Sequence, residues 1–406
     1  MKKISGNPYL QKDNDKLIID QVPFEYFSEN FKTPIMIFLE NKIKSNIQSF
    51  VKIFKSYFNN LQCFYSFKAN FLPEICKIIQ NQGIGAEIVG LPELKVALKV
   101  GFSPEKIIVG GPYLSTKLLK TSIKNKVKEI IVYSLNDLKK IDSIAKQYNH
   151  IQDICIRVNS QKYESRLGVD LNKKNLEFLE REKNKLENLN IKTILSHFST
   201  QMNNIKLFKR NINTIVENLE KLNKIGISIK NLNFGGGFPE ATIMTDKQLD
   251  FVAQEIKNLL DDLTINYESI YFEPGRYLVG DAGIFIAKIV QIKEKRWLFL
   301  NVGNHICPKF SRASLRFYNA SRISESHKYK TSFSGIIPTD QDILAKDYFF
   351  PEINSRGDKI IITNVGAYCL TFSNRFPYTL PSIFLVNGKE SKQIFNPNLE
   401  KDFSLS

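Results

Sequence analysis

The sequence predicts a parallel (β/α)8 barrel of the TIM type followed by a mostly β domain, and three observations lead to this fold class. Eight short β-rich runs alternate with amphipathic helical stretches between residues 60 and 280. Polar or glycine residues follow each run, as at the carboxyl ends of barrel strands. After residue 283, strands continue without helices. A doubly wound open sheet is the alternative, because periodicity cannot show closure.

The predicted elements follow in order along the chain. The barrel strands are Cys63–Ala69, Ala86–Val89, Lys106–Val109, Glu129–Tyr133, Asp153–Val158, Thr193–Phe198, Asn231–Phe234 and Ser269–Phe272. The helices between them include Phe71–Gln82, Pro92–Val100, Leu135–Tyr148, Asn175–Leu189, Ile205–Ile225 and Asp246–Leu263. A strand at Pro34–Glu40 and a helix at Asn41–Phe58 precede them. The later strands are Gly283–Ile292, Arg296–Val302, Ser332–Ile337, Lys359–Thr363 and Ser382–Val386.

Length and composition indicate two domains in a cytoplasmic protein. We place the barrel at residues 36–282 and the β domain at 283–406, with residues 1–35 joining the β domain. The chain has no run of 18 apolar residues, and its first residues lack the apolar core of a secretory signal. Five scattered cysteines and four histidines without ligand spacing predict reduced thiols and no metal site.

A net charge of +16 makes nucleic-acid binding one hypothesis. The basic residues, however, alternate with Glu, Asp and Asn along helices, and no basic stripe carries interleaved aromatic residues. We therefore expect a solvated basic surface that binds neither nucleic acid nor membrane and that would steer a polyanionic small substrate. A polyanion-binding barrel without catalysis is the alternative.

Lys68 is the first candidate catalytic residue, because it ends the short aromatic run that begins at Cys63. Burial at a strand end would lower the pKa of its amine and make it a nucleophile toward an aldehyde. Pyridoxal phosphate held as a Schiff base is the natural partner of such an amine. A solvated lysine is the alternative, and the other strand ends decide between the two.

A glycine loop and an arginine motif follow two later strands. Gly235, Gly236 and Gly237 allow close backbone approach, so their N–H groups could bind a phosphate. Arg276 could bind the same phosphate through its guanidinium. Glu273 could keep the nitrogen of a pyridine ring protonated and so make the ring an electron sink. A tight turn is the alternative for this motif.

Further strand ends carry groups that suit the same cofactor. His197 could stack on its ring, although a buried core histidine is the alternative. Thr200 could add a hydroxyl to the phosphate, and Tyr368 in the second domain could reach back with its phenol.

These motifs resemble, in order and over nearly the whole chain, the fold-type III pyridoxal-phosphate decarboxylases, the group of diaminopimelate and eukaryotic ornithine decarboxylases. The matching segments are Tyr65–Asn70, Gly85–Val89, Ser165–Gly168, His197, Gly235–Gly237, Glu273–Arg276 and Gly366–Tyr368. The resemblance implies a carboxy-lyase that works as a homodimer with shared active sites, with Lys68, His197 and Glu273 catalytic. The implied cofactor-binding residues are Lys68, Glu87, Arg157, His197, Thr200, Gly235, Gly236, Gly237, Glu273, Gly275, Arg276 and Tyr368.

Glu273 favours decarboxylation over racemisation. The related alanine racemases typically place an arginine against the ring nitrogen, which weakens the electron sink. A carboxylate there favours the carbanion that loss of carbon dioxide leaves.

The second-domain loop departs from the family pattern, which usually reads Gly-Pro-x-Cys and later Asp. Here the loop runs from Gly335 to Asp342, and Pro338 stands where the family has the cysteine that is implicated in protonating the carbanion. Either another acid replaces the thiol, or the chain is a non-catalytic homologue that binds the cofactor. The candidate acids are Asp340, Thr339, Cys307, His305 and Cys369.

The segment from residue 301 to 316 lacks the Arg-Pro pair typical of diaminopimelate decarboxylases and resembles a branch that acts on conjugated amino acids, including siderophore enzymes. We expect a citrate-conjugated substrate such as N-citryl-ornithine in rhizoferrin-like siderophore biosynthesis. The alternatives are diaminopimelate, free ornithine and lysine. The expected substrate-binding residues are His305, Arg312, Arg316, Thr339 and Asp340, although a solvated basic loop explains the cations equally well.

Overall fold

The computed structural model describes residues 2–3, 7, 9–13, 16–160, 165–311 and 314–399 of the 406-residue chain. The chain divides into two compact units. One consists of Ile47–Pro239 and Met244–Gly275, and the other of Met1–Asn46, Glu240–Ile243 and Arg276–Ser406.

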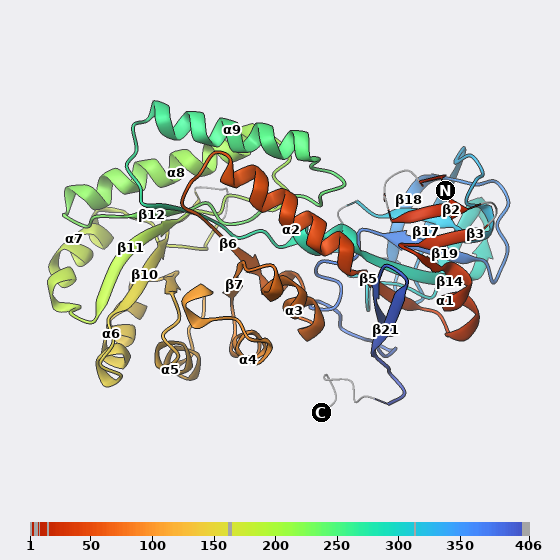
Figure 1. Cartoon of the computed structure of the whole chain (residues 1–406), viewed down its shortest axis with the longest axis horizontal. Helices are drawn as coiled ribbons and strands as arrows, with labels where there is room; N and C mark the ends of the chain where they lie inside the picture. Colours follow the sequence, from red (N-terminus) through yellow and green to blue (C-terminus); the bar gives the residue numbers. More distant parts are fainter. Residues whose placement is uncertain are drawn as a thin grey trace. The chain divides into compact units, whose positions relative to one another are not determined.

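The first unit is a closed barrel of eight parallel strands, which confirms the predicted fold class (Figure 1). Closure comes from the pairing of β13 with β6, so the open-sheet alternative is wrong. The strands are β6 (Leu61–Ser66), β7 (Gly85–Ile88), β8 (Ile107–Gly110), β9 (Glu129–Val132), β10 (Gln152–Arg157), β11 (Leu189–Leu195), β12 (Asn231–Asn233) and β13 (Ser269–Phe272).

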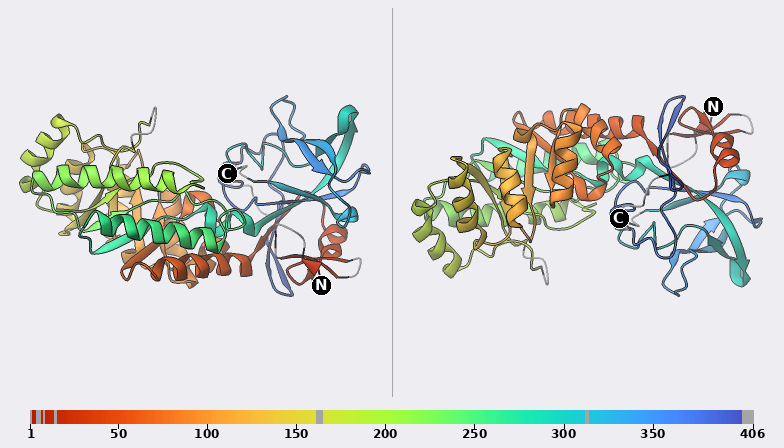
Figure 2. Two further views of the ribbon diagram at one scale, coloured as in Figure 1. Left: turned by 90° about the horizontal axis from the view of Figure 1, so that it is seen from above. Right: turned by 90° about the horizontal axis from the view of Figure 1, so that it is seen from below.

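Helices cover the outside of the barrel, and α8 and α9 run side by side there (Figures 1 and 2). The helices in order are α2 (Glu40–Lys55), α3 (Pro73–Asn81), α4 (Leu91–Val100), α5 (Thr116–Lys124), α6 (Asp137–Gln147), α7 (Lys173–Glu182), α8 (Ile205–Lys224) and α9 (Asp246–Asp262). The sequence analysis missed α5, whose N-cap Ser115 accepts a hydrogen bond from Leu118 N. It also extended α7 to Leu189, which instead begins β11.

The barrel interior has three layers. Its middle layer is a cluster of buried side chains from six strands, mostly apolar. These are Phe64, Ile108, Ile131, Cys155, Leu195 and Tyr271. Because side chains alternate along a strand, residues two positions before and after this layer also face the interior. We call the layer at the carboxyl ends of the strands the mouth and the layer at their amino ends the base.

The second unit is mainly β. Its nine-stranded sheet contains β5 (Ile35–Leu39), β14 (Gly283–Lys293), β15 (Trp297–Leu300), β16 (Arg316–Asn319), β17 (Tyr329–Ser334), β18 (Ile343–Phe350), β19 (Lys359–Thr363), β20 (Ser382–Asn387) and β21 (Glu390–Phe395). Strand β5 pairs with β14 and β20, so it lies in this sheet although the predicted barrel began at residue 36. A four-stranded sheet near the N-terminus comprises β1 (Lys2–Lys3), β2 (Leu10–Asp13), β3 (Lys16–Ile19) and β4 (Val22–Pro23), and the short helices are α1 (Phe24–Asn30) and α10 (Arg276–Val279).

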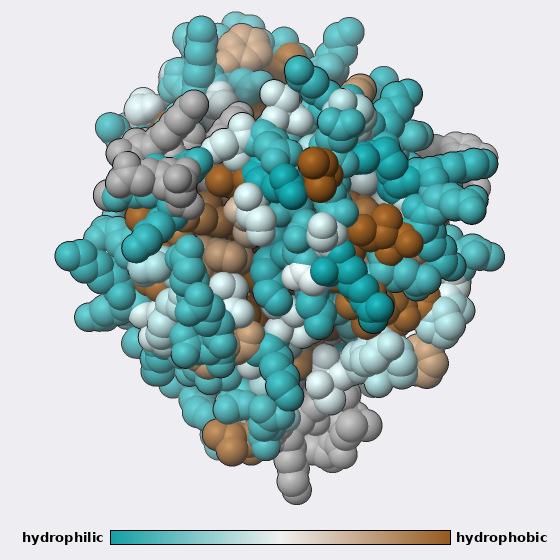
Figure 3. Space-filling view, turned by 90° about the vertical axis from the view of Figure 1, so that its right-hand side faces the viewer, coloured by the Kyte–Doolittle hydropathy of each residue, from teal (hydrophilic) through white to brown (hydrophobic). Residues whose placement is uncertain are grey.

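The face of the β unit in Figure 3 is mainly hydrophilic, with hydrophobic residues scattered among polar ones. Among the described residues, no helix combines the length and apolar character needed to cross a membrane.

Candidate active site

Lys68 lies in a single 3-10 turn, Phe67–Ala69, directly after β6. Its Nζ is 3.4 Å from Oε2 of Glu87 on the neighbouring strand β7. The Glu87 side chain is 3% exposed, whereas the Lys68 side chain is 44% exposed. The strand end is buried as predicted, but the Lys68 side chain is half-exposed, so the predicted burial of the amine is wrong. A buried carboxylate facing this amine is the structural basis of the site.

Ser66, which the sequence analysis did not single out, completes this arrangement. Its hydroxyl donates to the same Oε2 of Glu87 at 2.5 Å. Its backbone N–H donates to Pro274 O at 3.2 Å, which ties β6 to the segment after β13. A Cβ at Gly275 would lie 3.0 Å from Ala69 Cβ, so a larger residue there would force these closely packed segments to shift.

Glu273 follows β13 at the mouth and is buried. Its Oε1 accepts a hydrogen bond from Asn233 Nδ2 at 2.8 Å, and its backbone N–H donates to Gly235 O at 2.8 Å. Burial, and to a smaller extent the charge of Glu87, raise the pKa of Glu273 to about 7, while Lys68, Asn233 and Arg157 oppose the shift. A carboxyl group with this pKa can hold or release a proton near neutral pH.

The glycine loop lies against His197. Gly235 and Gly237 have φ values of 63° and 90°, a conformation that favours glycine. A Cβ at Gly235 would lie 2.9 Å from His197 Nδ1, and one at Gly236 would collide with Glu273 O. Backbone groups therefore line this part of the mouth, as an anion site requires. Thr200 is exposed in the segment after His197, and this segment meets the loop through Met202, whose N–H donates to Gly237 O at 2.7 Å.

Arg157 and Tyr133 form a pair at the ends of β10 and β9. Arg157 Nη1 donates to the Tyr133 hydroxyl at 2.6 Å, and its guanidinium lies 4.6 Å from the centre of the ring. Burial raises the pKa of Tyr133, while Arg157 opposes the shift. The sequence placed Tyr133 at a strand end but gave it no role. Its position two residues after the mid-layer Ile131 is the signal that points it inward.

Arg276 and Tyr368 lie together in the β unit. The guanidinium of Arg276 is 4.8 Å from the centre of the Tyr368 ring. Its Nη1 donates to Glu240 Oε1 at 3.0 Å and to Ser311 O at 2.9 Å. Within the described ranges, the buried Nε of Arg276 has no hydrogen-bond partner. The buried pair with Glu240 was not predicted, since 36 residues separate the two in sequence.

The expected substrate set does not form one cluster among the described residues. His305 is 1% exposed, and burial lowers its pKa to about 4, so it is neutral at pH 7 and unsuited to bind a polycarboxylate. Arg316 begins β16. Thr339 and Asp340 are exposed on the loop that contains Pro338, and Arg312 lies outside the described residues.

Asp342 organises that loop from within. Its Oδ1 accepts from Asn304 N at 2.6 Å and its Oδ2 from Ile337 N at 2.8 Å. The loop is thus built on a buried carboxylate, while Pro338 and its neighbours remain on the surface.

The residues present fit pyridoxal phosphate. An accessible amine faces a buried carboxylate, a second carboxyl group can titrate near pH 7, and a loop of backbone groups next to an imidazole has no room for side chains. In the β unit, a buried guanidinium N–H without a partner suits a phosphate oxygen.

Comparisons with known proteins support the same cofactor. Residues 41–280 match the family model described as pyridoxal-dependent decarboxylase, pyridoxal binding domain. A diaminopimelate decarboxylase of Aquifex aeolicus is 30% identical, over 91% of this chain and 90% of that protein. An L-glutamyl-[BtrI acyl-carrier protein] decarboxylase of Niallia circulans is 24% identical, over 87% of this chain and 88% of that protein.

Solved structures show the same fold. A crystal structure from Aquifex aeolicus has a TM-score of 0.81 at 27% identity and covers 96% of this chain and 95% of that one. The diaminopimelate decarboxylase of M. jannaschii in complex with L-lysine has a TM-score of 0.85 at 22% identity, with coverage of 96% and 95%. The chain therefore belongs to the pyridoxal-dependent decarboxylase family and is a pyridoxal-phosphate-dependent carboxy-lyase that acts on an amino acid.

Proposed function

We propose that the chain decarboxylates meso-diaminopimelate to lysine and carbon dioxide. The observation that carries this proposal is the 30% identity to the Aquifex aeolicus diaminopimelate decarboxylase over nine-tenths of both chains. The citrate-conjugate hypothesis loses one of its supports, because the neutral, buried His305 cannot serve as a cationic ligand.

In the proposed mechanism, pyridoxal phosphate supplies the electron sink that stabilises the carbanion left by decarboxylation. Lys68 would hold the cofactor covalently, and the carboxylate of Glu87 would face the nitrogen of that bond. Glu273 would hold or release a proton at the ring nitrogen, a role that a pKa of about 7 suits. His197 would orient the ring.

In the barrel unit, the backbone N–H groups of Gly235, Gly236 and Gly237 would donate to phosphate oxygens. In the β unit, the buried Nε of Arg276 is a candidate donor to a phosphate, since Nη1 already donates to Glu240 and to Ser311 O. Tyr368, whose ring lies over the guanidinium, would fix the orientation of Arg276.

A carrier- or citrate-conjugated amino acid is the second candidate substrate. Two observations favour it: Pro338 replaces the loop cysteine, and one relative acts on a glutamyl group attached to a carrier protein. The homodimer implied by the resemblance and the cytoplasmic location inferred from the sequence stay predictions, and analytical ultracentrifugation checks the first of them.

The test compares kcat/KM for meso-diaminopimelate, ornithine, lysine, N-citryl-ornithine and a glutamyl-carrier conjugate with the purified holoenzyme. The proposal predicts that meso-diaminopimelate exceeds every other compound by about tenfold or more, a difference of about 1.4 kcal/mol in transition-state binding. A higher value for a conjugate contradicts it. Carbon dioxide release from none of them would favour the non-catalytic homologue.

A further inference from the structure

We propose that Ser66 is a positioning residue that holds the carboxylate of Glu87 against the amine of Lys68. The inference rests on the proposed function in one respect, namely that Lys68 is the residue that bonds the cofactor.

The contacts converge on one oxygen atom. Oε2 of Glu87 accepts from the Ser66 hydroxyl at 2.5 Å and faces Lys68 Nζ at 3.4 Å. Ser66 and Glu87 are each 2% exposed, so water cannot substitute for either partner. The backbone of Ser66 is fixed by its hydrogen bond to Pro274 O and by the close approach of Gly275. The hydroxyl therefore has a defined position and one defined acceptor.

The two carboxylates differ in the donors that they meet. Glu87 meets the hydroxyl of Ser66 and the amine of Lys68, both at the same oxygen. Glu273 meets a neutral amide of Asn233 instead. Burial and, to a smaller extent, the charge of Glu87 raise the pKa of Glu273 to about 7.

Other titratable groups face this pair from the surrounding elements. Arg157 on β10 and Tyr133 after β9 act on Glu273 and on each other. Glu93 on α4 lies near Glu87 and Lys68, and burial raises its pKa to about 7. Of these groups, none is hydrogen-bonded to Oε2 of Glu87 within the described part of the chain, which leaves Ser66 and Lys68 to fix that oxygen.

The experiment measures the visible absorption of the holoenzyme as a function of pH, which reports the protonation of the nitrogen that joins Lys68 to the cofactor. An anionic neighbour favours the protonated nitrogen. In Ser66→Ala, Glu87 loses a charge-assisted hydrogen bond, so the midpoint should fall by about one pH unit. Ser66→Thr keeps a hydroxyl and should restore the wild-type midpoint. Ser122→Ala is the matched control, because it removes a buried hydroxyl of the same unit that donates to a backbone oxygen, Leu118 O.

Borohydride reduction and peptide mapping accompany the titration. If the cofactor maps to Lys68 and the Ser66→Ala midpoint equals that of the wild type, the inference is overturned and the proposed function stands. If the pyridoxyl group is found on another lysine, the role of Lys68 in the proposed function is wrong, and the inference about Ser66 is wrong with it. Should Ser66→Ala not fold, Ser66→Cys replaces it, since a thiol is a weak donor. The midpoint should then fall by a smaller amount, and an unchanged midpoint overturns the inference.

Discussion

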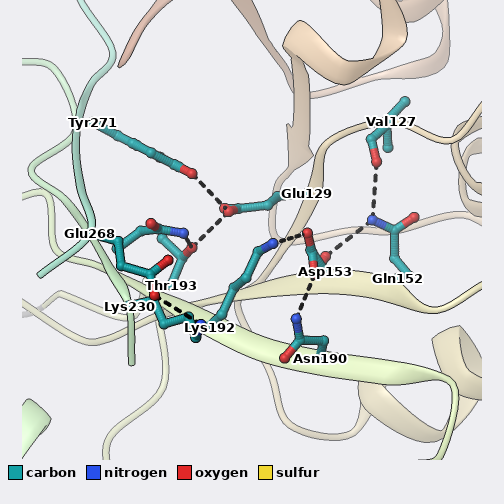
Figure 4. A network of polar contacts seen from close by, with 11 residues as sticks. Val127, Glu129, Gln152, Asp153, Asn190, Lys192, Thr193, Lys230, Glu268 and Tyr271 are labelled. Atoms are coloured by element: carbon teal, nitrogen blue, oxygen red, sulfur yellow. Dashed lines mark hydrogen bonds and ion pairs between the residues drawn. The ribbon is translucent and has the colours of Figure 1, made fainter. Parts of the chain in front are cut away.

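The mouth and the base of the barrel each contain a buried glutamate, and burial raises the pKa of both to about 7. At the base, Glu129 Oε1 accepts from Thr193 Oγ1 at 2.7 Å and from the Tyr271 hydroxyl at 3.2 Å (Figure 4). Tyr271 and Glu129 come from strands on opposite sides of the barrel, so this network ties its wall together across the interior. At the mouth, the buried glutamate that corresponds to Glu129 is Glu273.

The surroundings of the two glutamates differ. The base network is completed by Asn231, which donates to Thr193, and by the Lys192–Asp153 ion pair beside it (Figure 4). In the described ranges, Glu129 forms no ion pair. The mouth adds an accessible amine, a second carboxylate and a glycine loop. In both layers, therefore, burial of the carboxyl group is the main cause of the raised pKa. In the proposed function, what distinguishes the mouth is its accessible Lys68 amine beside a glycine loop of backbone groups.

The largest difference between the layers should appear when a lysine is removed from each. Lys68→Ala should abolish the visible absorption of bound cofactor and lower kcat about a thousandfold or more, equivalent to about 4 kcal/mol. Lys128→Ala removes an amine at the base, 5.7 Å from the centre of the Tyr271 ring, and should keep both properties. Steady-state kinetics and absorption spectra of the two variants provide the check. Equal losses would show that the layers are not functionally distinct.

The base glutamate should instead affect stability as pH changes. Because the folded-state pKa of Glu129 is raised from 4.5 to about 7, the native state holds a proton that the unfolded state releases. The associated stability is present below pH 4.5 and is lost as pH rises to 7, by up to about 3 kcal/mol. Glu129→Gln should remove this part of the pH dependence. Urea unfolding at pH 5 and pH 7 measures it, and an unchanged slope would contradict the assigned shift.

Replacing each of the two glutamates, Glu273 and Glu129, by glutamine should slow turnover at the mouth but not at the base. Glu273→Gln should bind the cofactor but slow turnover about 30- to 150-fold, because one charge-assisted hydrogen bond of about 2–3 kcal/mol to the ring nitrogen is lost in the carbanion. Glu129→Gln should stay within about twofold of wild-type turnover. Single-turnover decarboxylation rates report the chemical step directly. A single-turnover decarboxylation rate in Glu273→Gln equal to that of the wild type would exclude the proposed role of Glu273 at the ring nitrogen.

A smaller effect is expected from glycine substitutions in the two layers. Gly237 (φ 90°) would place a Cβ 2.8 Å from Met202 Cε, whereas Gly83 (φ 79°), in the turn before β7, has open space around that position. Both substitutions strain the backbone by a similar amount, about 1 kcal/mol or more. Gly237→Ala alone should weaken cofactor binding, by about tenfold. Titration of the stripped proteins with pyridoxal phosphate measures this, and equal affinities would remove the loop from the site.

The sequence predicted the barrel well because strands buried on both faces read as continuous apolar runs. It missed strands such as β1 and β4, which have two residues each, and β18, where exposed residues interrupt the pattern. It also missed helix α5.

The site was predictable where chemistry coincides with a strand end, as at Lys68, His197 and Glu273. Ser66 and Tyr133 were missed because their roles depend on contacts with other strands. Glu240 was missed for the same reason, since its partner Arg276 is distant in sequence. No pattern along the chain reports such contacts.

Borohydride reduction of the holoenzyme, followed by peptide mapping, tests the central claim most directly. The account predicts that the pyridoxyl group is found on Lys68, next to Glu87 at the mouth of the barrel. A pyridoxyl group on any other lysine would contradict the assignment of the mouth as the active site.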